Sequence, residues 1–127
     1  MAQNKVLSET VKQIISGLGL NWKEALWQQP QSGLWLMYHR YVEIAGGKAG
    51  IKYKFDDVEF NTKDGIAVVK CTAVMGDKQV CTYGEASPKN NKNAYPVSMA
   101  EKRAYDRAVL KLIGVHGFIY SEEEIDK

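Results

Sequence analysis

The fold of this chain is decided by residues 51–86, which read IKYKFDDVEFNTKDGIAVVKCTAVMGDKQVCTYGEA. Apolar and polar residues alternate along much of this stretch, and a period of two residues is typical of β-strands. The turn sequences at 61–65 and 76–77 divide it into the segments 51–60, 66–75 and 78–86. Because both turns are short, neighbouring strands should run antiparallel.

Upstream of this stretch, residues 34–44 also predict a strand, and Ala45-Gly46-Gly47-Lys48 predicts the hairpin turn that follows it. The sequence thus predicts a four-stranded antiparallel meander. The strand over 51–60 is expected to turn Ile51, Tyr53 and Phe55 toward the core and Lys52 and Lys54 toward the solvent or a ligand.

Downstream, residues 87–96 form a polar loop with proline near both ends, which we expect to be mobile in the unbound protein. Ser98 with Glu101 predicts a capping box, and Gly114 predicts a left-handed stop, so a helix is expected over 99–113. Its small and apolar stripe should pack on the sheet; the stripe consists of Ala100, Ala104, Tyr105, Ala108, Val109 and Leu112.

The N-terminal segment predicts two helices. Ser8 can cap the first, which Gly19 would end, and Asn21 with Glu24 can cap a second over residues 22–28. The expected architecture is α+β in a single domain, 1–127, with one long C-terminal helix on the meander, a β-β-β-α core. Its parts are a helical N-terminal segment over 1–30, a core over 34–117 and an acidic tail over 118–127.

Charge is distributed unevenly along the chain, although the net charge is only +2. Residues 86–117 carry six Lys/Arg against two Asp/Glu, whereas residues 118–127 carry one against four. On the predicted helix Arg103, Arg107 and Lys111 recur every four residues and should form one solvent-facing ridge, with Lys102 beside them. Such a ridge is typical of a polyanion-binding surface, and a solvated helix face would have the same pattern.

Several classes of protein are not indicated by the sequence. No apolar run is long enough to cross a membrane, and no secretion signal is recognisable at the start, so we expect a cytosolic protein. Two cysteines and two histidines without ligand spacing predict no metal, and no cofactor or small-molecule substrate is expected. No catalytic triad, Cys/His pair or phosphate-binding glycine loop is present, so we expect no enzyme.

The segments Tyr83-Gly84-Glu85-Ala86-Ser87 and Met99 to Gly114, separated by the polar loop, resemble the single-strand annealing superfamily. This superfamily comprises the Rad-fifty-two recombination mediators and the phage ERF and Sak recombinases. In its members a meander ends in a Tyr-Gly-Glu-like turn, followed by a polar loop and a basic helix that ends at glycine.

The resemblance implies a sequence-independent single-stranded DNA-binding protein that promotes strand annealing in DNA recombination, DNA repair or phage replication. It further implies a homo-oligomeric ring in the cytosol of a bacterium or a phage-infected host. Arg107 and Lys111 fall on helix positions that hold the DNA backbone in that family, and Lys102 and Arg103 extend the surface by one turn.

Single-strand binding without sequence preference needs cations along a backbone and aromatic faces on which bases can stack. Tyr95 could stack on a base or pack against the start of the helix, and the sequence leaves both open. The predicted nucleic-acid-binding residues are Lys52, Lys54, Lys89, Lys92, Tyr95, Lys102, Arg103, Arg107 and Lys111.

Two other functions have similar sequence features. A double-stranded RNA-binding module also combines antiparallel strands with a basic C-terminal helix, but it has three strands and a lysine-rich helix start. A metal-dependent nuclease could use Asp56, Asp57, Glu59 and Lys70, although on one strand these acids point to different faces.

Overall fold

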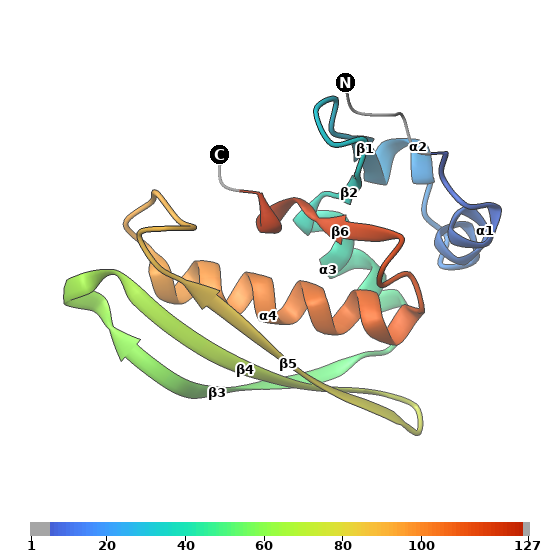
Figure 1. The fold of residues 1–127 in the computed structure, drawn as a ribbon. Helices are drawn as coiled ribbons and strands as arrows, with labels where there is room; N and C mark the ends of the chain where they lie inside the picture. The colour runs from blue at the N-terminus through green and yellow to red at the C-terminus, as the bar shows by residue number, and fades with distance from the viewer. Residues whose placement is uncertain (1–5, 126–127) are drawn as a thin grey trace.

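The computed structural model describes residues 6–125, which form three layers with one long helix in the middle (Figure 1). A three-stranded sheet covers one side of helix α4 (Pro96–Ile113), and the N-terminal elements with a second small sheet cover the other. The α+β class predicted from the sequence is confirmed.

The large sheet consists of β3 (Lys52–Asn61), β4 (Ile66–Met75) and β5 (Lys78–Ala86), in that order and antiparallel throughout. A 3₁₀ turn, η1 (Thr62–Asp64), joins β3 to β4, and Gly65 and Gly76 have positive φ where the chain reverses. Three of the four strands of the predicted meander, those over residues 51–86, are therefore confirmed. Tyr83-Gly84-Glu85 lies inside β5, as the predicted strand over 78–86 has it, and not at the turn that the family resemblance implies.

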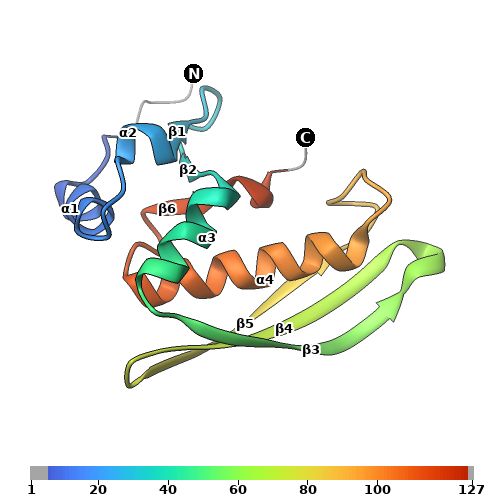
Figure 2. The same ribbon diagram turned by 180° about the vertical axis from the view of Figure 1, so that it is seen from behind.

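The fourth strand predicted over residues 34–44 is wrong. Only β2 (Trp35–Met37) is extended, and the chain then forms helix α3 (His39–Lys48), which includes the glycines expected to make a hairpin turn. Val42 and Ala45 recur at helical spacing and are fully buried, so packing overrides the strand propensity of this segment. Figure 2 shows α3 lying against α4.

The second sheet unites segments from both ends of the sequence. β1 (Leu26–Gln28) pairs antiparallel with β2, and β2 pairs parallel with β6 (Ile119–Ser121). The predicted caps Ser8 and Asn21 are confirmed at the starts of α1 (Glu9–Gly17) and α2 (Trp22–Ala25). The second helix is shorter than predicted because residues 26–28 join the sheet.

Helix α4 packs on two sides. Ala100, Ala104 and Ala108 lie on the large sheet, and Tyr105 and Val109 contact the core formed with α1, α3 and β6. The helix approaches the sheet so closely that a Cβ on Gly84 would lie 1.9 Å from the Ala100 carbonyl oxygen, so only glycine fits there.

The start of α4 differs from the prediction, and its end agrees with it. Pro96 occupies the first turn and Tyr95 is the N-cap residue without a side-chain cap, so the predicted capping box at Ser98 is not used. Gly114 ends the helix with φ 88°, as predicted. None of the helices within residues 6–125 is long and apolar enough to cross a membrane.

Candidate nucleic-acid interface

The nine predicted nucleic-acid-binding residues lie in three places. Lys52 and Lys54 are exposed on β3, on the outer face of the large sheet, which we define as the face turned away from α4. Arg107 and Lys111 line a groove along the second half of α4. The other five belong to the loop before α4 and to its first half: Lys89, Lys92, Tyr95, Lys102 and Arg103.

Arg103 does not face the solvent, contrary to the prediction. It is 3% exposed, and its guanidinium donates to the Glu123 carbonyl oxygen at 2.8 Å and to the Glu85 carbonyl oxygen at 2.9 Å. Two further hydrogen bonds go to Asn90. Because carbonyls from three segments converge here, the fork-shaped guanidinium serves as an internal tie rather than as part of a free ridge.

Arg107 is half-buried and ion-paired. Its guanidinium contacts the carboxylates of Glu124, at 2.7 Å, and of Glu85, at 2.9 Å. The hydrogen bond with Glu124 is the main reason that the pKa of Arg107 lies above its ordinary value, although partial burial acts in the opposite direction. Of the predicted ridge, only Lys111 is exposed.

The two arginines also cover the free edge of β5. Arg107 donates to the Tyr83 carbonyl oxygen at 2.6 Å, while Arg103 donates to that of Glu85, two residues further along the strand. An uncovered strand edge presents unpaired backbone groups to other chains. The arginine spacing on α4 therefore matches the carbonyl spacing on the edge strand beside it.

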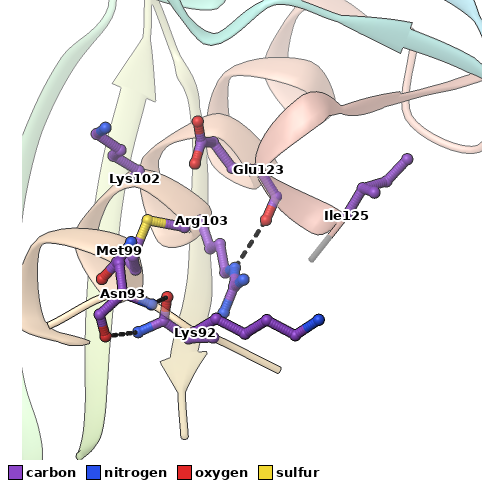
Figure 3. Close-up of a pocket in the computed structure, with 8 residues that line it drawn as sticks. Lys92, Asn93, Met99, Lys102, Arg103, Glu123 and Ile125 are labelled. Atoms are coloured by element: carbon purple, nitrogen blue, oxygen red, sulfur yellow. Dashed lines mark hydrogen bonds between the residues drawn. The ribbon is translucent and has the colours of Figure 1, made fainter. Parts of the chain in front are cut away.

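A hollow of about 360 Å³ lies between the loop, the start of α4 and the C-terminal segment (Figure 3). We call it the loop pocket. Arg103 lies at its centre and points to Glu123, whereas Lys92 and Lys102 extend outward in different directions. The loop was expected to be mobile, but Arg103 ties it at Asn90, and Asn90 also accepts from the Ser87 amide at 2.9 Å. No feature of the sequence indicates this tie.

A second hollow, of about 480 Å³, lies between β5 and β6 over the second half of α4. We call it the β5–β6 groove. Leu110 and Ile119 line it together with the cationic Lys111 and Arg107. The lining also includes aromatic and polar side chains, among them Tyr83, Tyr120, His116 and Glu124.

The acidic C-terminal segment, η2 (Glu122–Glu124), lies between these two hollows. Glu123 lines the loop pocket and Glu124 lines the β5–β6 groove. The tail predicted over residues 118–127 is not wholly outside the core, because Ile119 and Ser121 are buried in β6. Asp126, part of the predicted acidic end, lies outside the described residues.

A buried polar cluster lies beside the start of α3. Asp106 is 0% exposed and accepts hydrogen bonds from His39 Nδ1 at 2.8 Å and from Ser121 Oγ at 2.5 Å. Asp106 points to the α3 side of the helix, so it pairs with neither Lys102 nor Arg103, its basic neighbours in sequence. Its position next to the core residue Tyr105 was the signal that could have indicated burial.

The pKa values of this cluster reflect burial and pairing. Burial is the main reason that the pKa of Asp106 is raised to about 6. Burial alone would lower the pKa of His39, but the hydrogen bond and the charge of Asp106 raise it above 6.5. In this cluster the Asp106 carboxylate lies between the His39 imidazole and the Ser121 hydroxyl. In a catalytic triad the imidazole lies between the serine and the carboxylate, so this order does not activate Ser121 as a nucleophile. The cluster therefore joins α3, α4 and β6 structurally.

Acidic side chains do not gather into an evident metal centre. Within the described part of the chain, no three His, Cys, Asp or Glu side chains converge closely enough to hold a metal ion. Asp56 lies opposite Lys70 and Glu59 opposite Val68 in the sheet register, with a bulge between them.

Comparisons with protein-family models, curated proteins and solved structures gave no match.

Proposed function

We propose that this protein binds single-stranded DNA without sequence preference. The observation that carries the proposal is a group of three cations that form no ion pair with the described residues: Lys92 and Lys102, which line the loop pocket, and Lys89, which belongs to the same loop as Lys92. Unpaired ammonium groups are available to phosphates, whereas Arg103 and Arg107 already have internal acceptors. The phosphate contacts are therefore assigned to the lysines rather than to the arginines.

An aromatic side chain, Tyr95, lies at the end of the same loop, where α4 begins. The sequence left open whether Tyr95 stacks on a base or packs against the start of the helix. Because Tyr95 is 69% exposed, its ring is open to stacking, and this exposure supports base contact. Lys111, in the β5–β6 groove on the far side of η2, extends the positive charge along α4. Lys52 and Lys54 on the outer face of the sheet supply a second exposed cationic surface.

The resemblance to the single-strand annealing superfamily supports the same function. Three antiparallel strands, a polar loop and a basic helix that ends at glycine follow one another here in the order expected of that family. Strand annealing and assembly into a homo-oligomeric ring are the activities that this resemblance suggests, and we include them in the proposal. A protein of this kind would act in the cytosol.

The proposal is tested by removing two of the unpaired lysines. Lys92→Ala with Lys102→Ala should weaken binding to single strands of every base composition and lower the salt slope of log K by about 1.4, or about 0.7 for each phosphate contact. Binding would be measured by fluorescence anisotropy at several salt concentrations. Circular dichroism should show an unchanged fold, since both side chains extend away from the core.

A matched control removes two exposed lysines near the strand turns, Lys63→Ala with Lys78→Ala, and should bind like the wild type. Equal-length duplex DNA and duplex RNA complete the set, because a double-stranded RNA-binding module would prefer the RNA duplex. Wild-type affinity and salt slope in the Lys92/Lys102 variant would show that the loop pocket is not the DNA site. Arg107 is unsuitable for this test, because its removal would also release the edge of β5.

A further inference from the structure

The outer edge of β3 is free. β3 is an edge strand of ten residues, and within residues 6–125 no other segment pairs with its outer side. The opposite edge of the same sheet is covered by Arg103 and Arg107 from α4. Proteins usually protect exposed strand edges, so a long edge left open on one side indicates a pairing surface.

The direction of the backbone groups on β3 follows from the contacts of β5. The carbonyls of Tyr83 and Glu85 accept from α4 side chains and therefore face away from β4. Tyr83 lies opposite Lys70, and Lys70 lies opposite Asp56, so the alternation of an antiparallel ladder turns the backbone groups of Asp56 toward β4. Those of Tyr53, Phe55 and Asp57 consequently point outward.

The side chains along this edge change sign at its centre. Lys52 and Lys54 occupy the first half of the outer face, and Asp56 and Glu59 occupy the second half of the same face. Asp56 forms no ion pair within 4 Å with any described residue, although Lys70 is its neighbour on β4. The outer face of this strand therefore has lysines at one end and acidic residues at the other. None of these charged side chains forms an ion pair with another described residue.

We propose that β3 pairs antiparallel with β3 of a second copy of this chain, with Phe55 on the two-fold axis. In this register Lys54 lies opposite Asp56 of the second copy, in a pair without direct backbone hydrogen bonds, where side chains approach most closely. The bulge at Val58 adds one residue to each strand, so that Lys52 lies opposite Glu59 of the second copy. Four complementary charge pairs result from one symmetric contact.

Other pairings of the same edge are less favourable. A shift by one residue would place the outer-face charges against residues of the inner face. A parallel pairing in register would place lysine against lysine and acid against acid. The two-fold antiparallel register alone combines outward backbone groups with opposite charges.

The contact would join two large sheets into one of six strands, with α4 of each copy on the same side. A two-fold contact closes after two copies, so it yields a dimer by itself, and a ring requires a second interface. This inference concerns a protein partner and does not depend on DNA binding.

The test is a charge exchange followed by sedimentation velocity from about 1 µM to about 100 µM. The wild type should form dimers or larger even-numbered assemblies as concentration rises. Lys54→Glu and Asp56→Lys should each shift dissociation to at least tenfold higher concentration, because each places like charges opposite one another twice. The double variant should restore wild-type assembly.

The matched control makes the same charge change on the covered edge strand, Lys78→Glu, and should leave assembly unchanged. A wild type that stays monomeric throughout, or single variants that assemble like the wild type, would overturn the proposal. So would a double variant that remains dissociated while circular dichroism shows it to be folded.

Hydrogen exchange supplies a readout at the strand itself. The amides of Tyr53, Phe55 and Asp57 should gain protection as protein concentration rises, whereas those of Gln79 and Cys81 on the opposite edge should not. Equal and constant exchange at both edges would contradict pairing through β3. Both measurements are made without DNA, so their failure is distinct from a failure of the proposed DNA binding.

Discussion

At the scale of single residues, identical spacing on one helix leads to three different environments. Arg103, Arg107 and Lys111 recur every four residues, yet they are buried, half-buried and exposed in turn. The difference arises because β5 and the C-terminal segment converge over the middle of α4 and leave its end uncovered. The arginines are the residues with forked donors that can satisfy several carbonyls at once.

Arg103→Ala should therefore destabilise the protein by about 3 kcal/mol, because it leaves buried carbonyls without donors. Urea unfolding followed by circular dichroism measures this change. Lys102→Ala, next in sequence, is the control and should change the free energy of unfolding by less than about 0.5 kcal/mol. An Arg103→Ala variant as stable as the wild type would show that water replaces the guanidinium without cost.

At the scale of elements, the C-terminal segment η2 separates two hollows that are both lined by lysine and arginine side chains. Both carboxylate oxygens of Glu124 accept hydrogen bonds from the guanidinium of Arg107. A phosphate group is also negatively charged and could bind the guanidinium through two oxygens in the same way. The acidic segment follows the basic helix in sequence and folds back on it. It is attached through the Glu123 carbonyl oxygen, the Glu124 carboxylate and the Glu122 carboxylate, which accepts from the His39 amide.

Glu124→Gln should tighten single-stranded DNA binding at low salt and raise the salt slope by up to about 0.7, because one more cation becomes available to the backbone. Anisotropy titration checks this, with Glu9→Gln at the far end of the chain as control. Deletion from residue 122 onward should act in the same direction. Deletion from residue 121 would also remove Ser121, whose hydroxyl donates to Asp106. Weaker binding of Glu124→Gln would show that the segment supports the site rather than competing for it.

At the scale of the whole molecule, α4 holds two sheets together, and the cluster of His39, Asp106 and Ser121 joins the elements on its far side. Both titrating members have raised pKa values in the folded state, Asp106 to about 6 and His39 above 6.5. A raised folded pKa means that the folded state binds protons more strongly than the unfolded state.

The stability contributed by these two groups should therefore be greatest at acidic pH and decline as the pH rises, through about 6 for Asp106 and beyond 6.5 for His39. We expect Asp106→Asn to flatten this dependence between about pH 5 and about pH 8, measured as the free energy of urea unfolding at each pH. A wild type and a variant with parallel pH profiles would show that the cluster does not titrate in this range.

Much of the fold could be predicted from the sequence, because local signals and tertiary packing agree there. Alternation and short turns determined the meander over residues 51–86, Gly114 determined the end of α4, and Ser8 determined the start of α1. The segment over 34–44 was mistaken because β-branched and aromatic residues suit a strand as well as a buried helix. Its conformation depends on the surface of α4 that covers Val42 and Ala45.

The candidate site divides in the same way. The sequence by itself determined where charge concentrates, and in the structure Lys92, Lys102 and Lys111 form no ion pair with the described residues. Only the tertiary structure decided that Arg103 is an internal tie and that Arg107 faces two carboxylates. Periodicity fixes which residues share a helix face, but the contacts of that face come from β5 and η2, which lie far away in sequence and close in space.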